Sequence, residues 1–349
     1  MAYPVTRLRR LRQSQLIRDM VREADLNARM LIYPLFVVEG QDVKEPVAAM
    51  PGIFRQSIDT LLKEAKEIVG LSIPAVLLFG FPERRDERAS VAFAKNGVIQ
   101  TAVRALKDKF PDLLVITDVC LCAYSISGHC GILKNKVAAA ADETGNGQGK
   151  EAPEGEPEIF NDQTLEVLAK IALSHAEAGA DMLAPSSMMD GQVAAIRRML
   201  DGNNFKQTAL MSAGAKFNSQ LHTLFHDPDA PSPHPVDRMS YLLSPANAQE
   251  ALRDLAEDVE EGADIVMVSP AMAYLDIIAR AKQRFPVPIA AFQGGGEFGM
   301  VKAATAAGWM EEKALVLELL TALRRGGADL IVTFYAKDVA RWLSGQFLL

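Results

Sequence analysis

The stretch Ala178-Gly-Ala-Asp-Met-Leu-Ala184 joins the end of a predicted helix to the start of a predicted strand. Glycine ends a helix readily because it adopts left-handed backbone angles at little cost. The apolar residues after Asp181 suit a buried strand. The same Gly-Ala-Asp phrase recurs in Glu261-Gly-Ala-Asp264 and Gly326-Gly-Ala-Asp329. We interpret this recurrence as one supersecondary unit that the chain uses repeatedly.

Apolar strands and helical stretches alternate along the chain on both sides of this unit, as expected of repeated βα units. The predicted strands are Leu31–Val37, Ala75–Phe79, Leu113–Thr117, Asp181–Ala184, Ala209–Ser212, Asp264–Val268, Pro288–Phe292 and Asp329–Phe334. The predicted helices are Ser57–Gly70, Val98–Phe110, Gln163–Gly179, Gly191–Leu200, Asn247–Gly262, Tyr274–Phe285, Met300–Ala307 and Glu311–Gly327. Eight strands with helices between them favour a closed (β/α)8 TIM barrel over a doubly wound sheet.

Three segments interrupt or precede this alternation. Residues 1–30 mix arginines with apolar side chains, and we expect an N-terminal arm for subunit contacts ahead of a barrel over residues 31–349. Residues 138–157 are rich in Ala, Gly, Glu and Pro, which indicates a mobile surface insertion, either simply tolerated or acting as a lid. Residues 217–243 form a second long connection, and a lid over the barrel mouth is expected there.

Composition excludes several classes of protein. The net charge of −7 argues against a nucleic-acid partner, because neutralising phosphates requires a basic face. No apolar run reaches the length of a membrane span, and the first residues lack the apolar core of a signal peptide. We therefore expect a soluble, cytoplasmic protein.

All three cysteines lie in Asp118-Val-Cys-Leu-Cys-Ala-Tyr-Ser-Ile-Ser-Gly-His-Cys-Gly131, at the carboxyl end of a predicted strand. Cys120 and Cys122 share one face of an extended segment, and the glycines allow Cys130 to fold back. Cysteine is often a small core residue, but three in one segment favour a metal site. A disulfide is less expected with an odd cysteine count. Three thiolates leave a fourth tetrahedral position open, as in catalytic zinc sites.

Two further residues follow predicted strands and could perform chemistry. A lysine at the position of Lys216 is usually solvated, but beside a metal and apolar walls it could form a Schiff base with a carbonyl substrate. Asp118 could act as a general acid or base, or could hold a ligand in place.

Several motifs resemble those of the porphobilinogen synthase (5-aminolevulinate dehydratase) family. They are Arg9–Arg12, Asp118–Gly131, Ala184–Gln192, Ala215-Lys-Phe217, Gly262–Val268 with Pro270-Ala271, Tyr274–Ile277 and Gly296-Glu297. The resemblance covers nearly the whole chain apart from 138–157. It implies a (β/α)8 barrel that condenses two 5-aminolevulinate molecules into a pyrrole, in octamers built through the N-terminal arms. It also implies zinc on Cys120, Cys122 and Cys130, a Schiff base on Lys216, an active-site role for Asp118, and allosteric Mg²⁺ near Asp254.

The sequence departs from this family in the pocket for the second substrate. Ser269 stands where the family has its second Schiff-base lysine, and serine cannot form an imine. Phe292 and Phe334 replace family tyrosines, Gly295 replaces a serine, and a tyrosine follows Phe334. The residues predicted to line this pocket are Ser269, Phe292, Gln293, Gly295, Phe334 and Tyr335.

The pocket for the first substrate also differs. His222 corresponds to a family tyrosine and His226 to a family arginine, whereas Arg238 is kept. An imidazole recognises a carboxylate less well than a guanidinium at neutral pH. The two histidines are four residues apart, so they could reach a metal, act as acid and base, or be ordinary loop residues.

Two functions are therefore compatible with the sequence. The first is a lyase of this family that acts on 5-aminolevulinate or a related amino ketone through Lys216 and zinc, with a reaction altered by Ser269, in a homo-oligomer. The second is a non-catalytic relative that binds a small acid or a partner subunit through the inherited fold.

Overall fold

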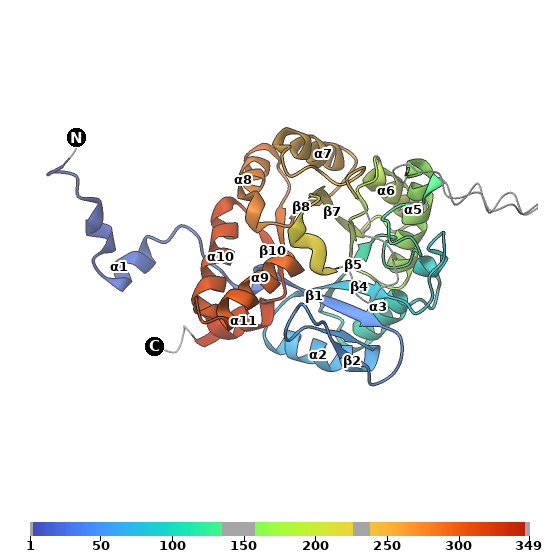
Figure 1. Cartoon of the computed structure of the whole chain (residues 1–349), viewed down its shortest axis with the longest axis horizontal. Helices are drawn as coiled ribbons and strands as arrows, with labels where there is room; N and C mark the ends of the chain where they lie inside the picture. The colour runs from blue at the N-terminus through green and yellow to red at the C-terminus, as the bar shows by residue number, and fades with distance from the viewer. Residues whose placement is uncertain (1–2, 135–157, 226–237, 346–349) are drawn as a thin grey trace, which may run out of the picture.

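The structure, a computed structural model, describes residues 3–134, 158–225 and 238–345. Eight parallel strands close into a barrel, because β1 pairs with β10 (Figure 1). The strands are β1 Leu31–Val38, β4 Ala75–Phe81, β5 Leu114–Val119, β6 Met182–Pro185, β7 Ala209–Lys216, β8 Ile265–Ser269, β9 Ile289–Gln293 and β10 Leu330–Thr333. They follow one another around the ring in chain order. The predicted (β/α)8 barrel is confirmed.

Helices surround this ring (Figure 1). They are α2 Ile58–Gly70, α3 Val98–Lys109, α5 Asn161–Glu177, α6 Gln192–Gly202, α7 Ala248–Glu260, α8 Leu275–Arg284, α9 Gly295–Ala306, α10 Glu312–Gly326 and α11 Ala336–Ser344. Short 3-10 turns are η2 Ala28–Met30, η3 Ser90–Phe93, η4 Gln220–Phe225 and η5 Met272–Tyr274.

Four elements differ from the sequence-based expectation. Helix α9 begins at Gly295 rather than Met300, because the Glu297 carboxylate accepts the Gly294 N–H at 2.6 Å and caps a glycine-rich first turn. Helix α11 was not predicted. Strands β2 (Lys44–Pro46) and β3 (Phe54–Gln56) form a small antiparallel extension, and β3 also pairs with β1.

The repeated Gly-Ala-Asp phrase has a structural role at all three places. Its glycines have positive φ values of 100°, 105° and 121°, which end the preceding helices. Its aspartates each accept a backbone N–H near the start of the neighbouring strand. The donors are Val115 to Asp181 (2.8 Å), Leu210 to Asp264 (2.8 Å) and Ile289 to Asp329 (2.9 Å). One turn thus ends a helix and fixes an adjacent strand.

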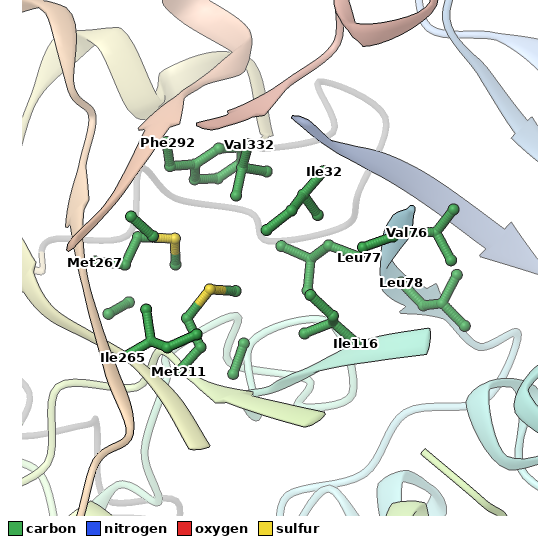
Figure 2. Close-up of a cluster of buried hydrophobic side chains, with 14 of the residues drawn as sticks. Ile32, Val76, Leu77, Leu78, Ile116, Met211, Ile265, Met267, Phe292 and Val332 are labelled. Carbon is green, nitrogen blue, oxygen red and sulfur yellow. The ribbon is translucent and has the colours of Figure 1, made fainter. Parts of the chain in front are cut away.

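The barrel interior is filled with apolar side chains. Figure 2 shows Ile32, Ile116, Met211, Met267 and Phe292 gathered inside the ring. All five are buried. The centre of the barrel is therefore packed core, and polar chemistry is confined to its ends.

The N-terminal segment runs away from the barrel (Figure 1). It contains the 3-10 turn η1 (Leu8–Arg12) and the short helix α1 (Gln15–Met20), and neither has a buried residue. Its apolar side chains Leu8, Leu11, Leu16 and Met20 are exposed. Within the described residues, no helix has the length and apolarity to span a bilayer.

We predict that Asp264→Ala destabilises the barrel by about 1–3 kcal/mol, because the buried Leu210 N–H loses its acceptor. Chemical denaturation followed by circular dichroism measures the change in the free energy of unfolding. The matched control is Asp108→Ala on the exposed side of α3, which should change it by less than about 0.5 kcal/mol. Equal effects of the two substitutions would contradict this role of the aspartate.

Candidate active site

Polar side chains converge at the rim where the parallel strands end. Asp118 lies in β5, Ser186 follows β6, Lys216 ends β7 and Ser269 ends β8. The β7–β8 register pairs Lys216 with Ser269 directly. The residue that the sequence singled out as a Schiff-base candidate and the serine that departs from the family pattern are therefore cross-strand neighbours.

A local irregularity in β7 sets this register. The pairing with β8 shifts between Ser212 and Ala215. The Ser212 hydroxyl donates to the Asp258 carboxylate of α7 at 2.7 Å, and a Cβ at Gly214 would lie 1.9 Å from the same carboxylate. A side chain at position 214 would thus push the Asp258 carboxylate away from its place beside Ser212. Such bulges re-aim the side chains that follow them, here Lys216.

Lys216 is linked to Asp118 through one intervening residue. The Lys216 ammonium donates to the Ser186 carbonyl at 2.7 Å, and the Ser186 hydroxyl donates to Asp118 Oδ1 at 2.6 Å. Ser186 thus fixes both side chains from the end of the strand between them. The sequence analysis did not name Ser186, although its position directly after a predicted strand was a usable signal.

The three cysteines converge beside this chain of contacts. Their sulfur atoms all lie within 4.8 Å of one another, and Cys120 Sγ and Cys122 Sγ are 3.4 Å apart. Cys120 and Cys130 are buried and Cys122 is half-buried. Among the described residues, this is the one group of three His, Cys, Asp or Glu side chains placed closely enough to hold a metal ion.

The spacing fits a tetrahedral metal. Sulfurs bound at about 2.3 Å to a tetrahedral ion lie roughly 3.8 Å apart, which is within the range found here. Three soft thiolate donors suit zinc and similar ions better than magnesium. The cluster could therefore hold a metal ion and leave a coordination position for a substrate.

The charges in this region are strongly coupled. Burial and the neighbouring Cys120 together raise the pKa of Asp118 to about 7, against the opposing effects of Lys216 and of the hydrogen bond from Ser186. Burial alone would lower the pKa of Lys216, but the negative charge of Cys130, Cys120 and Cys122 outweighs it and raises that pKa. Hydrogen bonds from Cys120 and Cys122 hold the pKa of Cys130 well below its ordinary value.

The connection after β7 returns over the cysteines. The guanidinium of Arg238, which is 9% exposed, donates to the Gly128 carbonyl at 2.8 Å. The Tyr241 hydroxyl accepts the Cys130 N–H at 3.3 Å and lies 3.3 Å from His129 Nδ1. This ordered stretch thus clamps the cysteine loop. Tyr241 and His129 were not singled out by the sequence, because only the folded path of the connection brings them together.

The first part of the same connection covers the β8 end. His222 in η4 lies with Nε2 at 3.3 Å from Ser269 Oγ. A Cβ at Gly296 would lie 2.2 Å from the Leu221 carbonyl oxygen, so only glycine permits η4 to lie on the start of α9. His226 and His234 lie outside the described residues, and so does the 138–157 insertion.

The ends of β9 and β10 are mainly aromatic. The Phe292 ring stacks on Phe79 with centroids 6.3 Å apart, and Phe334 lies 5.5 Å from Phe36. Gln293 is buried, and its side-chain oxygen accepts the Thr333 hydroxyl at 2.5 Å. Gly295 begins α9 at the same rim. Two of the residues predicted to contact the second substrate, Phe292 and Phe334, thus pack against other phenyl rings.

Tyr335 packs against α9. Its ring lies against Phe298 with centroids 4.5 Å apart, and the Lys302 ammonium lies over it at 5.3 Å. Phe334 also contacts Phe298, with centroids 5.9 Å apart. The role of Tyr335 as a substrate contact stays a prediction.

Comparison with known proteins assigns a family to this arrangement. Residues 5–342 match the family model described as delta-aminolevulinic acid dehydratase. The chain belongs to the delta-aminolevulinic acid dehydratase family. The protein of that name from Synechococcus elongatus is 46% identical over 98% of this chain and 100% of its own length. The one from Bacillus subtilis is 42% identical over 99% and 100%.

A solved structure of this family supports the same assignment. The delta-aminolevulinic acid dehydratase (porphobilinogen synthase) of Toxoplasma gondii, in complex with its product porphobilinogen, superposes with a TM-score of 0.89 at 36% identity. The match covers 99% of this chain and 94% of that one. The family is one of lyases, so the enzyme class predicted from the sequence is confirmed.

We predict that Cys130→Ser lowers the metal content of the purified protein at least tenfold, because two thiolates hold a soft ion far less tightly than three. Emission spectrometry on protein purified without chelator measures this content. Lys216→Ala is the matched control, because it alters the same site without removing a sulfur. An unchanged metal content in Cys130→Ser would show that the cluster is not the binding site.

Proposed function

We propose that this chain is a lyase that binds 5-aminolevulinate, or a related amino ketone, as an imine on Lys216 beside a zinc ion held by Cys120, Cys122 and Cys130. We further propose that its reaction has diverged from porphobilinogen formation. The observation that carries the proposal is the pairing of Lys216 with Ser269 at one rim: one amine is available for imine formation where the family pattern has two.

The chemistry at Lys216 follows from its surroundings. Lys216 must first lose a proton, because its surroundings raise its pKa. The unprotonated Nζ then adds to the ketone carbon, and water leaves as the C=N bond forms. The Ser186 carbonyl accepts a hydrogen bond from the Lys216 ammonium, and the Ser186 hydroxyl donates one to Asp118. Asp118, which can carry a proton, is thereby held on the same side of the site as Lys216. A zinc ion on the cysteines would supply a Lewis acid that polarises a carbonyl oxygen or holds an amine.

The second half of the site supports divergence. Ser269 cannot attach a second ketone covalently, and the phenyl rings of Phe292 and Phe334 offer no hydrogen bond to a carboxylate. Arg238 remains as a cation near the cysteines, which suits one acidic substrate. A non-catalytic relative would have no need of the connected Lys216, Ser186 and Asp118 contacts, so we favour the enzyme. The magnesium site near Asp254 stays a prediction.

The first test traps the imine. Incubation with 5-aminolevulinate and borohydride should add one reduced substrate to the protein, and peptide mass spectrometry should find it on Lys216. Lys216→Ala should abolish the adduct. Absence of an adduct on the unaltered protein would refute the proposal.

The product test uses the same substrate. We expect the unaltered chain to form porphobilinogen at least 100-fold more slowly than Ser269→Lys, because the substitution restores an amine opposite Lys216. Mass spectrometry and the colour reaction of the pyrrole measure the product. Equal rates of porphobilinogen formation would show that one lysine suffices and that the reaction has not diverged.

We also propose that the N-terminal arm contacts a neighbouring subunit in a homo-oligomer, an octamer by the family resemblance. The exposed Leu8, Leu11 and Leu16 support this, because they project from a segment without buried residues. Changing these three leucines to glutamate should reduce the mass seen by light scattering while circular dichroism stays unchanged. An oligomer of unaltered size would exclude the arm as the contact.

A further inference from the structure

The end of β8 carries a hydroxyl and an imidazole in contact, and neither has a role in the chemistry described above. Ser269 is 2% exposed, and its Oγ lies 3.3 Å from His222 Nε2. In the parallel ladder Ser269 is the direct partner of Lys216. Adjacent strands lie about 4.8 Å apart, so a small molecule attached to Lys216 Nζ lies within reach of the Ser269 side chain.

The position of His222 is supported by contacts of its own backbone and of the residues just before it. The His222 N–H donates to the Ser219 carbonyl at 3.0 Å, and the Leu221 N–H donates to Ser219 Oγ at 3.2 Å. The Leu221 carbonyl lies on Gly296 at the start of α9. Ser219 and the start of α9 thus both anchor η4 to the rim. The His222 imidazole is therefore held over the end of β8.

The base of η4 is anchored by an aromatic pair as well. Phe217, directly after Lys216, stacks on Tyr274 with ring centroids 3.8 Å apart and planes inclined by 10°. Both rings are buried. The chain between Lys216 and His222 is therefore fixed near its start. This keeps the distance between the imidazole and the lysine constant.

We propose that Ser269 and His222 form a proton-transfer pair for a substrate carried on Lys216. This inference rests on the proposed imine. In the protonated imine the neighbouring C–H bonds are acidified. One such proton passes to Ser269 Oγ as the hydroxyl proton moves to His222 Nε2, and the C–H electron pair becomes the C=C bond of an enamine. The C=N bond becomes a C–N single bond, so charge and atoms balance.

The two residues have different parts in this step. Ser269 is the catalytic residue, because its hydroxyl takes the proton from the substrate carbon, and His222 is a positioning residue that acts through it. The transfer requires the imidazole to be neutral with its proton on Nδ1, so that Nε2 can accept. The serine at the lysine position therefore has a function of its own. By taking the proton, it allows the enamine to form that a condensation on one imine requires.

The test is isotope exchange with levulinate, 4-oxopentanoate, which can form the imine but lacks the amine for pyrrole closure. The full-length protein is incubated with levulinate in D₂O, and NMR follows deuterium entry at C3 and C5. We expect catalysed exchange by the unaltered protein, and about a 100-fold loss in Ser269→Ala and in His222→Ala, the typical size of general acid–base effects. Because the two residues act in one relay, the double variant should lose no more than either single one.

Three controls make the outcome decisive. Borohydride trapping of levulinate on Lys216 should be retained in both variants, which separates proton transfer from imine formation. Added imidazole should restore exchange to His222→Ala but not to Ser269→Ala. Gln220→Ala, an exposed position on the same turn, should exchange like the unaltered protein.

The outcomes separate the two proposals. No trapped adduct in the unaltered protein would refute the imine itself. A trapped adduct with undiminished exchange in Ser269→Ala or His222→Ala would overturn the relay, as would a trapped adduct without exchange in the unaltered protein. Failure of imidazole to rescue His222→Ala would also overturn it, because the histidine would then act only by holding η4.

Discussion

The closing of the sheet between β1 and β10 is the constraint on which the rest of the structure depends. Once the ring is closed, all parallel strands end at one rim, and the apolar interior leaves that rim as the place for polar side chains. The Gly-Ala-Asp turns stabilise this arrangement from the opposite end, where their aspartates fix strand starts. Residues from distant parts of the sequence are therefore brought together by the closed strand order, and the loops do not have to bring them together.

The rim is divided into two chemically distinct halves. From β5 to β7 it holds thiols, a carboxylate and a lysine, connected through Ser186. From β9 to β10 it carries phenyl rings that pack on rings of neighbouring strands, Phe292 on Phe79 and Phe334 on Phe36. Ser269 on β8 lies between these two halves. It pairs with Lys216 of β7, and His222 lies over it. Family membership accounts for the scaffold and the lyase class.

The sequence predicted the barrel because each strand is a short apolar run and each helix has its own stop signal. It also predicted the convergence of the three cysteines, since all of them lie in a single segment. Contacts between elements could not be predicted in this way. The bridge through Ser186 depends on the β5–β6 register, and the His222–Ser269 contact depends on the path of η4. Helix α9 was placed too late because its first turn consists of glycines that Glu297 caps from within the helix.

The contact between Gly296 and Leu221 has a consequence for how this fold acquires new specificities. It joins main chain to main chain, so this contact does not depend on which side chain stands at position 221. Substitutions along that turn can therefore change the groups presented to the rim while the turn itself stays in register. In a scaffold of this kind the backbone shape can be kept while the chemical groups at the rim change. His222 occupies a position at which the side chain can be replaced in this way.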